Sequence, residues 1–299
     1  MSELPVVFVG VATLDAIAVV PHLPAPDERQ VADDMAFAGG GPAATAAVAA
    51  VRLGLRDVSF VGSVGDDDEG TRILAGLRAE GVDVSAVRRV PRTRSQTSVV
   101  LVERDSGTRA ICTRDVPALR VEPGSPAAAK IRGAAWVHVD HLGWPAVAAL
   151  IDLSDTRRPL LSVDAGNPIP ALRHEAIDLF VPTMDALRRA CGDLEPSALL
   201  DAALRAGVRR VVATMGADGA MAAAADGTRC GVPAYPAEIL STLGAGDVFH
   251  GALLAAVVRG EPLPSCLGYA AAAAALSCRA LDGRSAIPGH DEVVAALAA

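Results

Sequence analysis

Aromatic residues are scarce in this chain: they make up 3% of its 299 residues, while 51% of the residues are hydrophobic. The interior must therefore be filled by closely packed aliphatic side chains, and the length suits one large α/β domain or two small ones. No run of Lys and Arg occurs, and the formal net charge is −8. Composition therefore gives no electrostatic support to nucleic acid or a membrane surface as a partner.

Paired cysteines and targeting segments are also lacking. The five cysteines form neither a CxxC pair nor the spacing of a zinc site, which is typical of reduced thiols in a cytoplasmic protein. The N-terminus has no basic region or cleavage site, and Asp15 interrupts its apolar run, so it predicts a strand instead of a signal peptide. No apolar stretch provides the roughly 18 residues that a membrane-spanning helix needs.

Buried strands and helices alternate along the chain. Residues 6–11 are a continuous apolar run, as expected for a strand that is buried on both faces, and residues 58–64 predict another buried strand. The alternation after residue 134 predicts an α/β fold with a mostly parallel sheet and helices on both faces. In that part we expect strands at 136–139, 160–164, 179–181 and 211–215, helices at 145–153, 184–191 and 197–206, a hairpin at 220–225 and 228–232, and two late helices from 247 and near 264–278.

Three segments alternate in the manner of half-exposed strands, at about 14–20, 29–37 and 95–113. The last one predicts a hairpin that turns at residues 105–107. Together they would form a small sheet outside the main one, with one face over a ligand as a lid. An edge hairpin without function is the alternative. No linker or repeat is evident, so we expect a single domain over residues 1–299.

The stretch 241–254 combines two kinds of chemistry. Gly244, Ala245 and Gly246 form a turn of very small residues where the backbone can approach a ligand, and from Asp247 the apolar pattern becomes helical. N–H groups at a helix start have no partner and attract anions. Asp247 is either an ordinary first-turn Asp or a base beside these donors, which is what phosphoryl transfer to an alcohol needs.

Residues 242–247, TLGAGD, resemble the C-terminal signature of the ribokinase-like (phosphofructokinase-B type) carbohydrate kinases. A second signature, GGGPAATA at 39–46, lies at the appropriate distance upstream. The resemblance extends from about residue 6 to 288. It implies a ribokinase-like three-layer α/β/α fold with a β-strand lid, a kinase that uses ATP and Mg²⁺, a sugar acceptor, and a homodimer.

The same resemblance assigns roles to individual residues. Asp247 would be the catalytic base, and the amides of Gly244, Ala245 and Gly246 would stabilise the moving phosphoryl group. The acceptor would contact Asp15, Gly39, Gly40, Gly41 and Thr45; the family has an Asn at the position of Ala44 or Thr45, depending on the register. The nucleotide would contact Thr183, Thr214, Gly216, Gly219 and Thr242.

Two family features are altered here. Ser241 stands where the family has an Asp that helps to hold a monovalent cation, so the use of such a cation is left open. Thr183 and Ala186 replace the Asn and Glu of the family's Asn-x-x-Glu magnesium motif. Asp185, one position away from that Glu, is the metal ligand that we predict, acting through water.

The motifs are closest to those of the sulfofructose-kinase branch, which also lacks Asn-x-x-Glu. Arg29 falls where that branch has a sulfonate-binding Lys, but Thr113 replaces an Asn and the region at 140–141 lacks an expected Arg. We therefore do not assign sulfofructose as the substrate. We expect Arg29, Thr113 and Arg114 in the acceptor site, where the arginines could pair with an anionic group; solvated surface arginines are the alternative.

These observations predict ATP-dependent phosphorylation of a hydroxymethyl group on a sugar or sugar derivative. A nucleoside kinase of the same fold is one alternative. A non-catalytic sugar-binding or regulatory protein on this scaffold is another, motivated by the changes at Thr183, Ala186 and Ser241. His250, one helical turn after Asp247, is interpreted as a packing residue.

Overall fold

The computed structural model describes residues 4–105, 108–114 and 119–298. Its main sheet has eight strands in the order β14-β13-β12-β11-β10-β9-β1-β4. Neighbours from β4 to β12 are parallel, and β13 and β14 extend the sheet antiparallel. The strands are β1 (Val6–Val9), β4 (Val58–Val61), β9 (Trp136–Val139), β10 (Leu160–Ala165), β11 (Leu179–Pro182), β12 (Arg210–Thr214), β13 (Ala220–Ala224) and β14 (Arg229–Val232).

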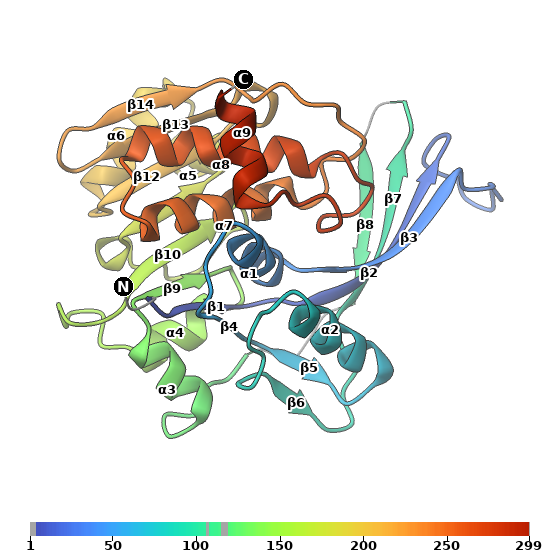
Figure 1. Cartoon of the computed structure of the whole chain (residues 1–299), viewed down its shortest axis with the longest axis horizontal. Coiled ribbons are helices and arrows are strands. Elements are labelled where there is room, and N and C mark those ends of the chain that lie inside the picture. The colour runs from blue at the N-terminus through green and yellow to red at the C-terminus, as the bar shows by residue number, and fades with distance from the viewer. Residues whose placement is uncertain (1–3, 106–107, 115–118, 299) are drawn as a thin grey trace.

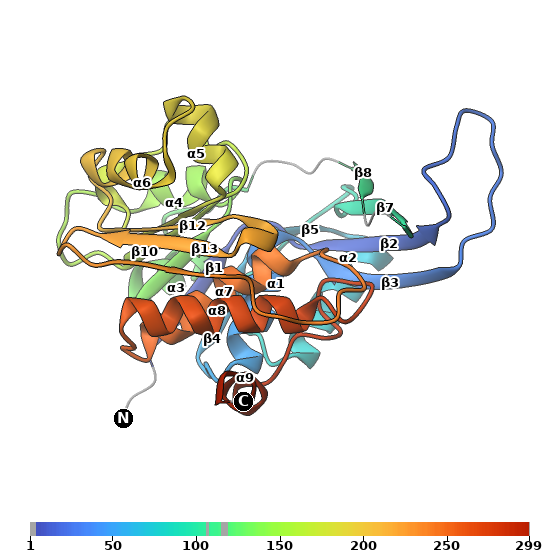
Figure 2. The same ribbon diagram turned by 90° about the horizontal axis from the view of Figure 1, so that it is seen from above.

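Helices lie on both faces of this sheet, which confirms the expected three-layer α/β/α fold (Figure 2). One face is covered by α1, α7 and α8, and the other by α3, α4, α5 and α6. The sequence also predicts helices at about 42–53 and 67–80, which α1 and α2 match, whereas α3 and α9 have no predicted counterpart. The helices are α1 (Pro42–Arg52), α2 (Asp68–Ala79), α3 (Pro126–Gly133), α4 (Trp144–Leu150), α5 (Met184–Cys191), α6 (Pro196–Arg205), α7 (Ala245–Val258), α8 (Leu263–Ser277) and α9 (His290–Ala298), with short 3₁₀ turns η1 (His174–Ala176) and η2 (Gly216–Asp218).

Small side chains allow α1 and α7 to approach closely. Residues 43–50 of α1 are all buried, and six of these eight are Ala. A Cβ on Gly251 of α7 would lie 2.3 Å from the carbonyl oxygen of Ala46 in α1. Since a side chain at Gly251 would push the helices apart, this glycine fixes their separation.

A second sheet projects from one end of the body and has the strand order β3-β2-β7-β8 (Figure 1). Its strands are β2 (Thr13–Val20), β3 (Asp34–Gly40), β7 (Thr97–Glu103) and β8 (Arg109–Thr113). The sequence placed β3 too early: residues 29–33 lie outside it, and it continues through Gly39 and Gly40. The expected turn at 105–107 falls partly outside the described residues. We call this sheet the lid sheet.

A short parallel pair, β5 (Ser63–Gly65) and β6 (Arg88–Val90), lies beside α2. No helix within the described ranges is both long and apolar enough to cross a bilayer.

Candidate active site

One buried carboxylate joins the ends of β1 and β9 to the start of α1. Asp140 Oδ2 accepts the N–H groups of Val11 at 2.7 Å and Ala43 at 3.3 Å, while Oδ1 accepts two amides of the following turn. A Cβ on Gly10 would lie 2.2 Å from this carboxyl group, so position 10 has to be glycine. Burial raises the pKa of Asp140, which acts here as a structural link between elements.

The turn at 244–247 has the predicted form, but α7 begins at Ala245, two residues earlier than expected. Gly244 is its N-cap with φ 75°, a left-handed conformation that favours glycine. The N–H of Ala245 donates to the carbonyl of Thr242 at 3.3 Å. Those of Gly246 and Asp247 have no acceptor among the described residues. Of the three predicted donors, the N–H groups of Gly244 and Gly246 therefore have no acceptor in the described chain, that of Ala245 is used within the turn, and that of Asp247 is a further free donor.

Asp247, in the first turn of α7, is surrounded by other carboxylates. It is only partly exposed, and burial together with the charges of Asp164 and Asp140 raises its pKa to about 8. The positive charge of Arg284 opposes this shift, and the negative charge of Asp15 adds to it. A carboxyl group with such a pKa can exchange a proton with a ligand close to neutral pH.

Asp15 lies on the face of the lid sheet that turns toward this turn. In the strand register Asp15 is beside Ser98, and Ser98 is beside Thr113, so the three form one row across the lid sheet. Burial raises the pKa of Asp15, and the nearby hydroxyl groups of Thr13 and Ser98 and the charge of Arg284 oppose this rise. Asp15 Oδ1 is buried and has no hydrogen-bond partner in the described chain.

The triple glycine makes room for the site's own side chains. A Cβ on Gly39 would lie 2.3 Å from Nη1 of Arg284, and one on Gly40 would lie 2.0 Å from Oδ2 of Asp15. Gly41 has φ 93° and is the N-cap of α1, with Pro42 at the first helical position, as expected. The sequence assigns these glycines to acceptor contacts; in the structure two charged side chains occupy the space at Gly39 and Gly40.

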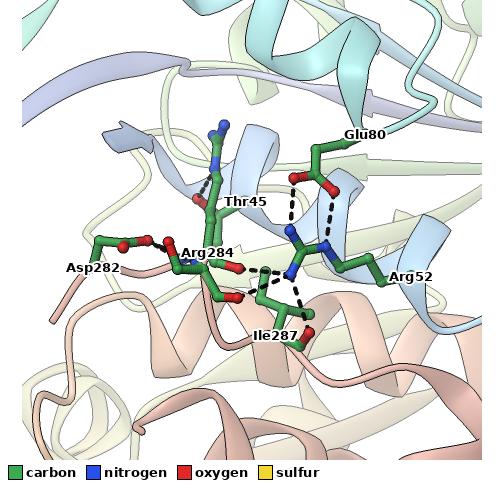
Figure 3. Close-up of polar contacts among 7 residues, drawn as sticks. Thr45, Arg52, Glu80, Asp282, Arg284 and Ile287 are labelled. Atoms are coloured by element: carbon green, nitrogen blue, oxygen red, sulfur yellow. Dashed lines mark hydrogen bonds and ion pairs between the residues drawn. The ribbon is translucent and has the colours of Figure 1, made fainter. Parts of the chain in front are cut away.

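Arg284 is a residue of this site that no sequence motif marks. Its side chain is buried, at 8% relative exposure. Nε donates to Thr45 Oγ1 at 3.1 Å (Figure 3), and Nη2 donates to the carbonyl of Gly40 at 2.7 Å. Thr45, predicted as an acceptor contact, therefore holds Arg284. We define the acceptor subsite as Asp15, Gly40, Thr45 and Arg284.

The loop that carries Arg284 is held through its backbone. Arg52 Nη1 donates to the carbonyls of Arg284 at 2.9 Å and Ile287 at 3.1 Å, and Glu80 fixes the other side of the Arg52 guanidinium at 2.6 and 2.8 Å (Figure 3). Asp282 Oδ1 accepts the N–H of Arg284 at 2.8 Å. Because these contacts use backbone atoms of the loop, they fix where the Arg284 side chain starts.

The predicted nucleotide residues fall into two groups. Thr183 and Thr214 form a bridge between the ends of β11 and β12, and Thr183 is the N-cap of α5. Gly216 and Gly219 lie in the loop after β12 with φ values of 59° and 90°. The structure thus brings Thr183 and Thr214 together at the carboxyl edge of the sheet, where ligands of open α/β sheets bind.

Residues 241 and 242 precede the turn and make contacts within the chain. Ser241 is buried, and its Oγ accepts the N–H of Leu243 at 3.2 Å. Thr242 is exposed, and its Oγ1 accepts Nη1 of Arg109 from β8 at 3.0 Å. The lid sheet therefore touches the segment that leads into α7.

Three predicted residues are not brought to the acceptor subsite of the same chain. Arg29 is exposed in the loop beyond the paired ends of β2 and β3, about 15 Å of strand away from Asp15. Arg114 donates to the carbonyl of Ser95 at 3.3 Å, at the base of the lid sheet. Asp185 has a side chain that is 74% exposed and paired with Arg188. No contact supports it as a metal ligand, and that role stays a prediction.

A buried group of polar side chains lies on α7, β9 and β10, near Asp247. Asp164 Oδ1 is 3.6 Å from Nε2 of His250, and Nδ1 of His138 is 3.0 Å from Ser162 Oγ. Burial lowers the pKa of both histidines, that of His138 to about 3, so they are neutral. His250 is a packing residue in this group, in line with its interpretation from the sequence. Asp164, which no sequence motif marked, contributes to the raised pKa of Asp247.

Residues 4–289 match the family model described as pfkB family carbohydrate kinase. The chain is 28% identical to the ribokinase of Bacillus subtilis over 293 residues, covering 95% of this chain and 96% of that protein. It is 26% identical to the nucleoside kinase of Methanothermobacter thermautotrophicus over 294 residues, covering 96% and 93%.

The fold agrees with that of an Arabidopsis thaliana ribokinase solved with ribose and ATP, with a TM-score of 0.84 and 25% identity over 99% of both chains. The family model spans nearly the whole sequence. The two signatures, at 39–46 and 242–247, lie at the starts of α1 and α7 in the candidate site. The protein is a member of the pfkB family of carbohydrate kinases.

Proposed function

We propose that the protein transfers the γ-phosphoryl group of ATP to a hydroxymethyl group of a sugar or sugar derivative. The observation that carries this proposal is the start of α7, where unpartnered N–H groups adjoin a carboxyl group whose pKa is raised to about 8. Such donors stabilise a migrating phosphoryl group, and such a carboxylate can accept the hydroxyl proton. The named activity of the Bacillus subtilis relative and the ATP-bound Arabidopsis structure support it.

In the proposed reaction the Asp247 carboxylate takes the proton of the acceptor hydroxyl. The hydroxyl oxygen then forms a bond to the γ-phosphorus, while the bond from phosphorus to the bridging oxygen breaks and ADP leaves with that electron pair. The amides of Gly246 and Asp247 are the donors for the charge on the transferred group. Asp15 binds acceptor hydroxyls through the oxygen that has no partner in the chain.

Mg²⁺ fits this site as an ion that arrives with the nucleotide. No group of three or more metal-ligating side chains occurs in the part of the chain that the structure describes. The phosphates of ATP and water molecules would therefore supply most of its ligands. The carboxylate of Asp185 or Asp164 would contact the hydrated ion through a bound water molecule. When bound, the ion would neutralise charge on the phosphates. At position 241 the neutral hydroxyl of Ser241 offers no carboxylate to a monovalent cation.

The lid sheet is proposed to cover the acceptor and keep water away from the phosphoryl group. Its row of Asp15, Ser98 and Thr113 faces the site, and Arg109 touches Thr242. Together these contacts support a lid that presents polar groups to the acceptor while it closes against the start of α7.

Replacement of the base tests the function. Asp247→Asn should lower kcat at least about 10³-fold with a small effect on the KM for ATP, because general-base catalysis and an ionised group are both lost. Asp155→Asn, on an exposed loop, is the matched control and should keep full activity. In the wild-type enzyme kcat/KM should rise with pH up to about 8, the pKa of Asp247 in the free enzyme. Near-normal turnover of Asp247→Asn in an ADP-coupled assay would refute the proposed base.

A nucleoside kinase is the second candidate, favoured by the relative from Methanothermobacter. Both activities would use the same base and the same donors, so the acceptor decides between them. A screen of free sugars, sugar acids and nucleosides with ATP separates the two. A nucleoside with a higher kcat/KM than every other acceptor would establish the second candidate.

A further inference from the structure

The acceptor subsite contains a buried positive charge without a counter-ion. Arg284 is 8% exposed, and the partners of its Nε and Nη2 are neutral oxygens of Thr45 and Gly40. Nη1 donates no hydrogen bond to any described residue, and no described carboxylate forms an ion pair with the guanidinium. The charges of Asp15 and Asp247 act on it only at longer range. A buried guanidinium without an anionic partner is unfavourable unless a bound ligand supplies that partner.

Elsewhere the chain pairs its buried arginine. Arg158, whose side chain is 11% exposed, binds Asp178 Oδ2 at 2.8 Å. Arg52 is bound by both oxygens of Glu80. Arg284 therefore differs from Arg158 and Arg52, because it lies in the acceptor subsite without a carboxylate partner.

The unpartnered atoms in and beside the subsite differ in kind. Asp15 Oδ1 and Thr13 Oγ1 are buried oxygens without a partner in the described chain, and the first of them can only accept a hydrogen bond when ionised. Arg284 Nη1 can only donate. A ligand that satisfies both sides therefore brings hydroxyl donors to Asp15 and an oxygen acceptor, best a charged one, to Arg284.

We infer that the acceptor carries an anionic substituent, a carboxylate or a phosphate, on its hydroxylated carbon chain, and that Arg284 selects it. The inference rests on the kinase function proposed above. All polar side-chain contacts of Arg284 are made with β3 and α1, the elements of the triple-glycine signature, and none with the turn before α7. This placement assigns Arg284 to the acceptor and not to the γ-phosphate.

Twin acceptors that differ only in charge test the inference. The wild-type enzyme is assayed with ribose, ribonate and ribose 1-phosphate, and with glucose and gluconate, all of which have a free hydroxymethyl group. We expect one anionic twin to have a kcat/KM about 10- to 100-fold above that of its neutral partner, as a charge-assisted hydrogen bond provides. The carboxylate and phosphate arms identify the anion.

Arg284→Gln should abolish that preference by lowering kcat/KM much more for the anionic twin than for its neutral partner, and Arg284→Lys should retain part of the preference. Both variants keep the backbone contacts of Arg284 to Arg52 and Asp282, so the loop should stay in place. An equal loss for both twins, or a raised KM for ATP, would assign Arg284 to the phosphoryl group and overturn the inference. A wild-type preference for every neutral twin would also overturn it.

A binding measurement separates this inference from the proposed function. By calorimetry without nucleotide, the preferred anionic twin should bind the wild type, and Arg284→Gln should weaken it about 10- to 100-fold. Arg284-dependent binding of an anionic twin without any turnover would support the inference while the kinase function fails. Turnover without any preference for an anionic twin would support the kinase function and refute the inference about Arg284. If no anionic twin binds in an Arg284-dependent way, the inference is wrong.

Discussion

Asp247 places a negative charge where the folded protein disfavours it. Its pKa is about 8 in the folded chain against 3.8 for a solvated Asp, so the unfolded chain gives up this proton at lower pH. The group therefore lowers stability increasingly as pH rises from 3.8 to about 8. Asp247→Asn should be more stable than the wild type by on the order of 1–3 kcal/mol at pH 8, and by less at pH 5.

Urea unfolding at the two pH values checks this expectation, with Asp155→Asn as the control. A difference that is equal at both pH values would show that packing changes, and not the titration of Asp247, caused the effect. A variant that is both inactive and more stable would identify position 247 as a site where function is maintained at the expense of stability.

Gly246 is the second residue whose identity we attribute to the proposed function. A Cβ at this position meets no atom within 4 Å, so the chain itself does not require glycine there. In an early helical position Gly246→Ala should raise stability by about 0.5–1 kcal/mol. The added methyl group would stand over the free amides, so kcat should fall at least about tenfold.

Gly76→Ala is the matched control, since a Cβ at this glycine of α2 also meets no atom within 4 Å. It should gain similar stability with unchanged kcat. The comparison uses thermal unfolding and initial rates of all three proteins. Unchanged kcat in Gly246→Ala would mean that the phosphoryl group does not approach this amide.

The signature residues could be predicted because their chemistry is local. The small-residue turn, the free amides and Asp247 lie within a few positions of one another. Arg284 could not be predicted, because its position in the site depends on a contact with Thr45, which is 239 positions away in the chain. The space for its side chain also depends on Gly39, and only a tertiary structure shows that this glycine faces an arginine.

At the scale of elements, α1 and α2 hold the loop that carries Arg284. Arg52 at the end of α1 bridges Glu80, the C-cap of α2, and the carbonyls of the loop (Figure 3). Lys has a single ammonium group and cannot bind both the Glu80 carboxylate and the carbonyls of the loop as the Arg52 guanidinium does. Arg52→Lys should therefore lower stability by about 1–2 kcal/mol and raise the KM for the acceptor several-fold, with little change in the KM for ATP.

Steady-state kinetics and chemical unfolding measure both effects, with Arg78→Lys on the exposed side of α2 as the control. Equal increases in the KM for acceptor and ATP would show a general loosening of the fold. An unchanged acceptor KM would show that the loop keeps its position without Arg52.

Elements with strong apolar patterns were placed well by the sequence, and those fixed by tertiary contacts were not. The strand expected at 136–139 has those bounds in the structure. β3 was expected at 29–37 but pairs with β2 over Asp34–Gly40, because the register with β2 continues through the glycines to Thr13. α9 buries only Val293, so its sequence carried little of the periodicity that marks a helix.

At the scale of the whole molecule, the lid sheet has two different faces. The face with Asp15 and Ser98 turns to the proposed site. On the other face Phe37, Ala16 and Val99 are neighbours in the strand register, and Met35 lies one row further along. Phe37 is 70% exposed, Met35 59% and Val99 53%. A cavity of about 340 Å³ beside α2 is lined by Phe37 and Val99 and does not include Asp247.

Such a group of exposed apolar side chains on a sheet calls for a partner, and a second copy of the chain fits the dimer that the family resemblance implies. We expect a homodimer in which the outer faces of two lid sheets pack together.

Phe37→Asp would place a charge in that contact and should convert the dimer to a monomer at micromolar concentration, as measured by size-exclusion chromatography with light scattering. Val294→Asp, a similar change at a 48% exposed residue of α9, is the control and should leave the dimer intact. A monomeric wild type, or a Phe37→Asp variant that stays dimeric, would show that this face does not join two copies; in that case the apolar outer face has a different role from the one argued here.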